Sequence, residues 1–509
     1  MHEPEATETA SIMSRAPIVE TRAIDYIPWA ERRGQVWHQG PFWFAGSFVL
    51  VTMAVGFTGP LAGLGFGWSA LAAVLGSAVG TFFMAFHANQ GPRLGIPQMI
   101  QSRAQFGIRG VIVPLLAALC VYIGFNAFNG PMATQGFQAV AGKSWPWFAT
   151  VIAVQLLIAI AGYDLIHRVQ RWMTYALIAS FAVLTVGSLI ALDAGKYFVM
   201  GPLHATAFFS QFVVSAGYQI GFAIYVSDYT RYLPANTRLA PIVLWTYAGA
   251  NLSALWLMPL GSLYALALKN GATITSVQTA GNLFAPGLGS AVMLVSAVAL
   301  TTVMAVNTYG ATLVALTALD CFTPIRSTMR TRILGTLIVS VPTIALSLLL
   351  PEAYQESFSN FLTLMLYFLV PWSAINLVDY YWVRRGEYAV LEMFRTDGVY
   401  GRWAWRGLVS YAVGFFAMVP FFALPFFTGP AARALGGVDV SIIFGLLVSG
   451  LTYYGLARRM DLSREHDAQL ASLAALEPTG GATITTVETA GEAHYCRSTA
   501  PTVPSAYTN

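Results

Sequence analysis

Long apolar runs, separated by short polar segments, constrain this chain more than any other feature of its sequence. A helical membrane span needs about 20 mostly apolar residues. Twelve runs meet or approach that length, at residues 42–66, 69–88, 111–134, 147–162, 173–193, 207–226, 240–266, 289–318, 333–350, 359–382, 407–428 and 437–457. Only 10% of the 509 residues are charged, whereas a soluble domain carries roughly 25%. The pattern predicts an all-α polytopic membrane protein with about 12 transmembrane helices.

The positions of the basic residues predict the orientation of the chain. All but four of the 27 Lys and Arg residues fall in the two tails or in the loops on the same side; the exceptions are Lys143, Lys196, Lys269 and Arg433. Because cytoplasmic loops are enriched in Lys and Arg, we expect both termini to be cytoplasmic. The expected location is the inner (plasma) membrane, with the first span directing insertion because residues 1–40 show no cleavable leader.

The chain is predicted to have three parts. Residues 1–39 form a cytoplasmic N-terminal tail, residues 40–457 the membrane domain, and residues 458–509 a cytoplasmic C-terminal tail. The last tail is rich in Ala, Thr and Glu and poor in aromatic residues, which predicts disorder. The three cysteines lie far apart and indicate neither a disulfide framework nor a metal site.

Residues 215–234, SAGYQIGFAIYVSDYTRYLP, combine an apolar run with Gly217, Tyr218, Gln219 and Gly221 before turning polar at Ser227. A loosened helix survives in a membrane only where it lines a cavity, since every backbone polar group needs a partner. The stretch therefore predicts a broken helix that faces a polar solute. Close helix packing is the alternative explanation, because glycine is common in membrane spans.

Polar residues recur at equivalent places in the two halves of the chain. Tyr122 and Asn126 share one face of the third span, and Asn307 stands beside Tyr309 in the eighth, five spans later. The first and sixth spans, also five apart, both contain several glycines. Interrupted helices at corresponding positions of two halves indicate a midplane site in a transporter. Taken singly, each Asn or Tyr is better explained by a hydrogen bond between helices.

The predicted spans carry almost no ionisable side chain, although proton pumps and anion carriers usually hold such groups at depth. We therefore expect an uncharged solute and a coupling ion bound by neutral oxygens. Thr301 and Thr302 offer hydroxyl oxygens near the middle of the eighth span, and sodium, a hard cation, suits such ligands. Asp228 and Arg231 are expected to form a structural or gating pair at the inner end of the sixth span.

Aromatic rings together with carboxamides suit a flat heterocycle, because the ring stacks and the amide offers both a donor and an acceptor. A sugar carrier would use the same residue types. An amino-acid carrier would need partners for both charges of the zwitterion, which a helix end could partly supply.

Four motifs in the right order resemble the nucleobase–cation symporter family, especially its purine–cytosine permease branch. They are GPRLGIPQMIQSRAQFG at 91–107, SDYTRYLP at 227–234, NTYGATLVALT at 307–317 and PWSAINLVDYYWVRRGEY at 371–388. The resemblance covers about residues 36–457. It implies a LeuT-like fold of two inverted repeats of five helices followed by two extra helices, and transport of nucleobases or related compounds with sodium or protons.

The resemblance also implies roles for single residues. Tyr122 falls where the family has a stacking aromatic residue, Asn126 where it often has a ring-binding glutamine, and Asn307 matches a substrate-binding asparagine. A sodium site is implied at Ala45–Phe48 together with Val298, Thr301 and Thr302. Gln219 occupies the place of a tryptophan of hydantoin carriers and Val49 that of a glutamine, which argues against a hydantoin. Tyr218 or Phe222 then supplies the second stacking surface.

The sequence as a whole predicts a secondary transporter that imports a neutral nucleobase, cytosine or a purine, with sodium by alternating access. Asn126, Gln219 and Asn307 would read the edge of a base stacked near Tyr122. Open alternatives are proton coupling, an allantoin-like ureide, vitamin or nucleoside as cargo, and a substrate sensor or channel. No enzyme, cofactor or nucleic-acid partner is expected, because no catalytic set of residues is evident; the oligomeric state stays open.

Overall fold

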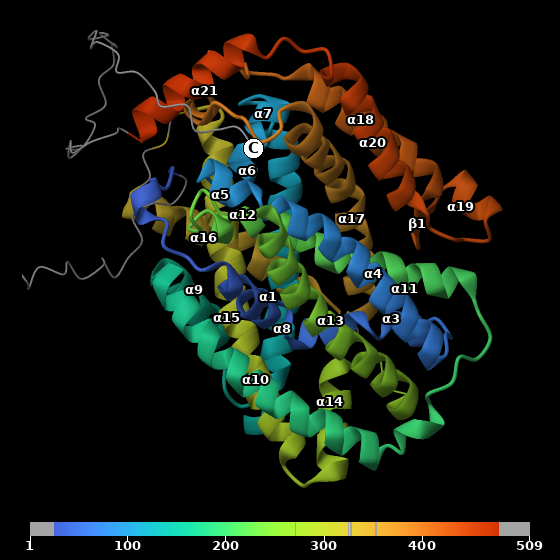
Figure 1. Cartoon of the computed structure of the whole chain (residues 1–509). Helices are drawn as coiled ribbons and strands as arrows, with labels where there is room; N and C mark the ends of the chain where they lie inside the picture. The colour runs from blue at the N-terminus through green and yellow to red at the C-terminus, as the bar shows by residue number, and fades with distance from the viewer. Residues whose placement is uncertain are drawn as a thin grey trace, which may run out of the picture.

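The computed structural model describes residues 25–161, 163–269, 271–323, 325, 328–351 and 354–477, and the described chain is almost entirely helical (Figure 1). The first half contains α1 (Gln39–Ser47), α2 (Leu50–Val55), α3 (Thr58–Leu61), α4 (Phe66–His87), α5 (Gln90–Leu94), α6 (Gln98–Gln101), α7 (Arg103–Phe106), α8 (Ile112–Ala141), α9 (Trp147–Ala161) and α10 (Tyr163–Ala191). The second half contains α11 (Ala205–Ile220), α12 (Val226–Thr230), α13 (Leu239–Leu268), α14 (Thr273–Phe284), α15 (Leu288–Asp320), α16 (Met329–Leu349), α17 (Gln355–Val378), α18 (Trp405–Met418), α19 (Pro430–Ala434), α20 (Ser441–Ala457) and α21 (Ser463–Leu476).

Short elements join these helices. The 3-10 turns are η1 (Trp29–Glu31), η2 (Val36–His38), η3 (Ala194–Lys196), η4 (Gly221–Ile224), η6 (Val390–Phe394) and η7 (Val419–Phe421), and η5 (Asp379–Val383) is a π-helical turn that continues α17. A small antiparallel hairpin pairs β1 (Ala423–Leu424) with β2 (Phe427–Thr428), with Ala423 opposite Thr428.

The helices confirm a polytopic membrane protein. In the described part of the chain eight helices are long and apolar enough to cross a bilayer, and a bent pair, Val36–Ser47 with Leu50–Leu61, makes a ninth candidate. Three shorter apolar helices, Trp147–Ala161, Trp405–Phe421 and Ser441–Ala457, occupy the other predicted runs. Each run predicted from the sequence thus contains an apolar helix, while the count of twelve spans stays a prediction.

The packing of the bundle places the broken spans at its centre. α8 packs along α15, α11 lies against α4 and α17, and α13 contacts both α1 and α4. α18 and α20 pair on one flank of the molecule, whereas α9 and α10 form the opposite flank (Figure 1). The segments α1 to α3 and η4 to α12 are therefore enclosed by longer helices.

The first span breaks at Phe48 and Val49, and its two parts are bent by 65°. Val49 is extended, with φ −138° and ψ 162°, so the helical ladder stops there. The Thr52 hydroxyl and the Val49 amide both donate to the Ser47 carbonyl, which closes the break locally.

Side chains from other helices satisfy the backbone beyond this break. Gln211 of α11 accepts from the Gly59 amide (2.7 Å) and donates to the Val55 carbonyl (3.0 Å). Ser262 donates to the Gly56 carbonyl (2.7 Å). Irregular backbone at membrane depth needs partners of this kind, since no water is available in hydrocarbon.

The sixth span is broken as well, although its glycines serve two purposes. α11 ends at Ile220, η4 follows, and Tyr225 interrupts the helix with φ −142° and ψ 8° before α12 begins. Gly217 lies within α11, where a Cβ atom would come within 2.4 Å of the Leu362 carbonyl oxygen. Both explanations of this stretch therefore hold: Gly217 permits close packing on α17, and the break follows at residues 221–225.

Besides the short helices α5, α6, α7 and α19 in the loops, two longer helices were not expected from the sequence. α14 lies between the seventh and eighth predicted spans, and α21 lies in the C-terminal tail that was predicted to be disordered. That prediction is wrong for residues 463–476. The remaining part of this tail, 478–509, and residues 1–24 of the N-terminal tail lie outside the described residues.

α21 folds because one of its carboxylates enters a buried ionic cluster. We define this cluster by Asp379, Arg384, Glu465 and the phenols of Tyr388, Tyr400 and Tyr453. Arg384 Nε lies 2.8 Å from Glu465 Oε1, and Arg384 Nη1 lies 2.5 Å from Asp379 Oδ1. Tyr400 donates to Glu465 (2.7 Å), and Tyr453 (2.8 Å) and Tyr388 (2.9 Å) donate to Asp379. The composition of the tail could not reveal these partners. Arg384 and Tyr400, for example, precede Glu465 by 81 and 65 residues.

Candidate functional site

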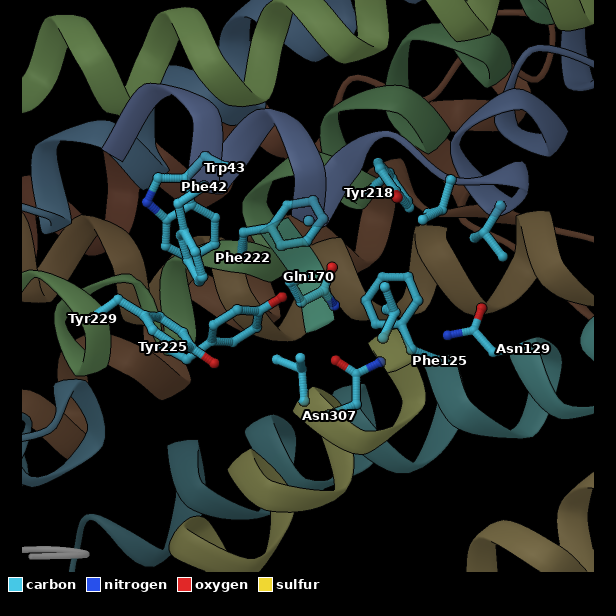
Figure 2. A pocket seen from close by; sticks show the side chains of 15 residues that line it. Phe42, Trp43, Phe125, Asn129, Gln170, Tyr218, Phe222, Tyr225, Tyr229 and Asn307 are labelled. Atoms are coloured by element: carbon cyan, nitrogen blue, oxygen red, sulfur yellow. The ribbon is translucent and has the colours of Figure 1, made fainter. Parts of the chain in front are cut away.

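A cavity lies where both broken spans meet α8, α10 and α15. Its empty volume is about 610 Å³, part of it open to the surroundings. Its lining residues are Phe42, Trp43, Gly46, Val49, Val51, Phe125, Asn129, Gln170, Tyr218, Phe222, Tyr225, Tyr229, Val303, Val306 and Asn307 (Figure 2). None of these 15 side chains carries a charge. Such a cavity favours an uncharged ligand, because a charge taken out of water without a partner is very costly.

Aromatic rings make up one side of the cavity. The Trp43 ring lies 5.8 Å from the Tyr225 ring, 5.6 Å from that of Tyr229 and 6.1 Å from that of Phe222. Phe222 also meets Tyr218 edge to face at 5.4 Å. Figure 2 shows these rings gathered around the space that the amides of Gln170 and Asn307 also face. Rings held in this way by one another present fixed surfaces for a flat ligand.

Tyr122 lies one layer behind these rings. It is not among the lining residues; its ring stacks on Tyr225 with centroids 5.3 Å apart and an interplanar angle of 29°. Behind it is Gly310, where a Cβ atom would come within 2.5 Å of the Tyr122 ring. Tyr122 thus packs behind Tyr225, whose ring lines the cavity, and the stacking role predicted for Tyr122 stays a prediction.

Asn126 links α8 to α15 and orients Asn307. Its Nδ2 donates to the Met304 carbonyl (2.9 Å) and to the Thr308 hydroxyl (2.9 Å). Its Oδ1 therefore faces Asn307 and accepts from Asn307 Nδ2 at 3.0 Å. The Asn126 side chain thus makes three hydrogen bonds to α15 and does not line the cavity.

Asn307 presents an amide oxygen to the cavity, and Asn129 lines it as well (Figure 2). Asn307 Nδ2 donates to Asn126, so Asn307 Oδ1 lies on the opposite side of the amide and is left for a ligand. Asn129 Oδ1 is one of several buried side-chain atoms that have no hydrogen-bond partner among the described residues. A ligand can supply the missing partner of such an atom. Asn307 Oδ1 is thus one acceptor for an N–H or O–H group, and Asn129 Oδ1 is a candidate for a second.

Gln170 adds a third amide from α10, and sequence reasoning missed it. Its side chain is 6% exposed and faces the cavity (Figure 2). The predicted fifth span began at 173, whereas α10 begins at Tyr163. The basic residues around Gln170 gave that segment the composition of a loop. Trp43, Asn129, Tyr225 and Tyr229 were likewise not selected, although all four stand within or next to motifs that the sequence singled out.

Gln219 faces away from the cavity. Its Nε2 donates to the Ala250 carbonyl of α13 (3.1 Å), and it is absent from the lining. Its neighbours Tyr218 and Phe222 do line the cavity, and the stacking role predicted for one of them stays a prediction. Successive residues of a helix point about 100° apart, so Tyr218 and Gln219 face different neighbours. Neither Gln219 nor Asn126 lines the cavity, and their predicted role in reading the base stays a prediction.

The residues predicted to bind a cation lie beside the cavity without lining it. Gly46 and Val49 of the first span and Val303 of α15 face the same space, next to Ala45, Phe48 and Thr302 respectively. The Thr301 hydroxyl donates to the Ala297 carbonyl and the Thr302 hydroxyl to the Ala299 carbonyl, both at 2.8 Å. Each hydroxyl oxygen keeps lone pairs that can accept a cation. Val298 stands on the same helix, and its role stays a prediction.

Tyr218 connects the cavity with the break in the first span. Its hydroxyl lies 2.6 Å from the Thr52 hydroxyl, which in turn donates to the Ser47 carbonyl. Two hydrogen bonds therefore link the break to the aromatic wall.

A second hollow leads away from the cavity along one side. It shares Phe42, Gln170 and Tyr229 with the cavity and continues past Trp37, His38 and Tyr232. A third hollow, near Thr58 and Asp439, shares no lining residue with the cavity. Among the described residues, the cavity therefore adjoins the hollow at the end where the N-terminal segment lies, with Phe42, Gln170 and Tyr229 between them.

Asp228 and Arg231 lie at that same end and join three segments. Asp228 Oδ1 accepts from the Gln98 amide (2.7 Å), which ties α12 to α6. Arg231 Nε donates to the Asp228 carbonyl (3.2 Å), and its Nη1 donates to the Asp25 carbonyl (3.4 Å). Neither residue lines the cavity. These contacts suit the predicted structural or gating role, which stays a prediction.

A helical bundle with two broken spans meeting at an uncharged cavity is the arrangement of secondary transporters built from inverted repeats. Residues 26–445 match the family described as permeases for cytosine/purines, uracil, thiamine and allantoin. The chain belongs to this family, the nucleobase–cation symporters, and it is a transporter and not an enzyme.

Related proteins support the same assignment. The chain is 37% identical over 463 residues to YxlA of Bacillus subtilis, which is provisionally named a purine-cytosine permease; the match covers 89% of this chain and 100% of that one. It is 25% identical to the purine-cytosine permease fcyB of Emericella nidulans, covering 86% and 87% of the two chains. It is 24% identical to the purine-cytosine permease FCY2 of Saccharomyces cerevisiae, covering 87% and 86%.

Solved structures confirm the predicted fold. The inward-facing conformation of Mhp1 superposes with a TM-score of 0.70 at 18% identity, over 92% of this chain and 100% of Mhp1. A closed conformation of Mhp1 with bromovinylhydantoin bound gives a TM-score of 0.68 over 89% of this chain. At this identity the likeness shows the fold alone, which is the LeuT-like arrangement that the motifs implied.

Proposed function

We propose that this chain imports an uncharged nucleobase, cytosine or a purine, together with sodium, by alternating access across the plasma membrane. Both termini would lie in the cytoplasm, as the distribution of Lys and Arg favours. The observation that carries the proposal is the composition of the cavity: fixed aromatic rings and three amides, with no charge among its 15 lining residues.

The amides suggest which edge of the base is read. Asn307 turns its Oδ1 to the cavity, and Asn129 Oδ1 has no hydrogen-bond partner in the described part of the chain, so both oxygens could accept from N–H groups of a base. Cytosine and adenine each present an amino group and a ring N–H. Gln170, with both a donor and an acceptor, would complement a neighbouring ring nitrogen or carbonyl. Hypoxanthine has two ring N–H groups but no amino group, so it offers fewer donors to these acceptors, and we expect amino-bearing bases to be preferred over it.

The rings would hold the base between Trp43, Tyr225 and Phe222. Aromatic stacking contributes about 0.5–1.5 kcal/mol beyond the burial of area. Stacking distinguishes little among the bases, because every base has a π-face. Rings would therefore set affinity for flat heterocycles, while Asn129, Gln170 and Asn307 set the choice among them.

Sodium would bind between the break of the first span and α15. Its proposed ligands are the backbone carbonyls of Ala45, Phe48 and Val298 and the hydroxyls of Thr301 and Thr302. A neutral oxygen site is favoured over proton coupling because, among the side chains that the structure describes, no carboxylate or imidazole lines the cavity. Sodium would order the broken segment, whose Gly46 and Val49 face the base, and so favour substrate binding.

Release would follow the hollow that passes Trp37, His38 and Tyr232. Rotation of the helices carrying the broken spans against the rest would close this path and open the other. The coupling is one of affinities: sodium and base must tighten each other's binding by the same factor.

Equilibrium binding to the purified protein tests the proposal. Radiolabelled cytosine and adenine are measured in sodium and in potassium, with hypoxanthine, uracil, allantoin and thiamine as unlabelled competitors. We expect saturable binding of an amino-bearing base that weakens at least tenfold in potassium. Tight binding of allantoin or thiamine with no binding of either base would replace the proposed cargo. Equal binding in both salts would remove sodium from the proposal.

A further inference from the structure

An apolar groove lies between α4, α17 and α20, on a part of the surface that shares no residue with the central cavity. Its walls include Phe82 and Phe86 of α4, Trp382 of η5, and Leu447 and Tyr454 of α20. Its empty volume is about 1440 Å³, part of it open to the surroundings. We call it the lateral groove.

Small residues keep the lateral groove open. Gly450 lies in its wall, and a Cβ atom there would have Val378 at 3.4 Å as its one neighbour within 4 Å. The opposite wall is fixed, because Tyr381 donates to the Phe86 carbonyl (2.9 Å). The groove is thus a built feature with space for a flexible apolar chain.

Basic residues come in the sequence just after η5 and α20, two of the elements that form the walls. Arg385 comes three residues after Trp382, and Arg458 and Arg459 come four and five residues after Tyr454. All three side chains are exposed. Two carboxylates nearby have other partners: Asp461 Oδ1 accepts from the Ser463 amide (3.0 Å), and Glu387 lies 3.8 Å from His466.

Rings at this end mark a membrane interface. Trp382 is 64% exposed and Tyr454 41% exposed, and such amphipathic rings gather at the level of lipid headgroups. The apolar groove, the rings at its end and the arginines beyond them correspond, in that order, to the acyl chain, the glycerol region and the phosphate of one molecule.

We propose that the lateral groove is a binding site for one anionic phospholipid. An acyl chain lies between Phe82, Leu447 and Gly450, and the phosphate lies within reach of Arg385, Arg458 and Arg459. Each arginine near a membrane surface favours an anionic lipid roughly fivefold. Zwitterionic lipid fills the same groove with less preference, because its net charge is zero.

The first test removes the space. Gly450→Leu would place a side chain in the groove, while Gly455→Leu adds the same side chain on the same helix at a position with no atom within 4 Å. Each variant is purified and exchanged into mixed vesicles of phosphatidylglycerol and phosphatidylcholine, and retained lipid is counted by native mass spectrometry. We expect wild type and Gly455→Leu to retain phosphatidylglycerol at least tenfold over phosphatidylcholine, and Gly450→Leu to lose it.

The second test removes the charge and does not depend on the folding of Gly450→Leu. Arg458→Gln combined with Arg459→Gln should keep a bound lipid but lower the preference for phosphatidylglycerol at least tenfold. Arg433→Gln, in α19 before the opposite end of α20, should leave that preference unchanged. Retention of both lipids without preference in the wild type would overturn the proposal. So would a wild-type dimer without bound lipid that Gly450→Leu converts to monomer.

Discussion

The central cavity and the ionic cluster at Asp379, Arg384 and Glu465 are both buried and polar, yet their polar atoms are used differently. In the cluster the buried guanidinium faces two carboxylates, and three phenols donate to those carboxylates. Burial, with Glu465 nearby, raises the pKa of the Tyr400 phenol, so it stays protonated and donates. The cavity instead leaves Asn129 Oδ1 without a partner among the described residues.

The difference separates a structural polar network from a binding site. A satisfied network holds segments together, here η5, the loop that follows it and α21. A polar group left without a partner costs about 1–3 kcal/mol, which a ligand can recover on binding. In the cluster, partners compensate the buried charges. The residues that line the cavity carry no charge, which suits a solute that must leave again.

The largest effect is expected from breaking the cluster. Arg384→Met would leave Asp379 and Glu465 buried without their counter-charge, at a cost of roughly 3–5 kcal/mol. We expect little folded protein, or a strongly lowered melting temperature in size-exclusion thermal assays. Arg385→Met changes the exposed neighbour and should behave as the wild type. If both variants melt alike, the cluster is not structural.

A substitution in the cavity is expected to weaken substrate binding strongly while leaving the fold intact. Asn307→Ala removes the acceptor that faces the base and should weaken binding of cytosine or adenine about tenfold to a hundredfold. Its melting temperature without substrate should fall far less than that of Arg384→Met. Unchanged affinity of Asn307→Ala would take this residue out of the site.

An intermediate and selective effect is expected at the proposed cation site. Thr302→Ala removes one oxygen ligand and should raise the sodium concentration for half-maximal uptake roughly tenfold, with uptake recovered at high sodium. Thr317→Ala is the matched control, because its hydroxyl makes the same 2.8 Å bond to the preceding turn of α15. Equal loss at every sodium concentration would argue against coordination by Thr302.

The smallest effect distinguishes the two faces of α11. Gln219→Ala removes the bond to the Ala250 carbonyl and should cost about 1 kcal/mol of stability. Substrate affinity should stay within twofold of the wild type. A tenfold loss of affinity would restore the role in base reading that the sequence suggested for Gln219.

Much of the fold could be predicted from the sequence, because bilayer crossing imposes length and composition. The broken first and sixth spans followed from glycines and polar residues at equivalent places. Gln219 was expected to read the base, whereas in this structure its side chain faces α13; its place in a family motif does not give the direction in which the side chain points. Gln170 was missed because α10 begins with polar and basic residues, which resemble a loop. α21 was missed because its fold depends on the distant Arg384 and not on its own composition.

Uptake into proteoliposomes shows whether this chain carries a nucleobase with sodium. Radiolabelled cytosine, adenine and hypoxanthine are supplied outside, with an inward sodium gradient or with potassium in its place. We expect saturable uptake of cytosine or adenine that potassium abolishes and that Asn307→Ala impairs. Uptake equal in sodium and potassium, or no uptake of any of the three bases, would rule out sodium-driven transport of a nucleobase.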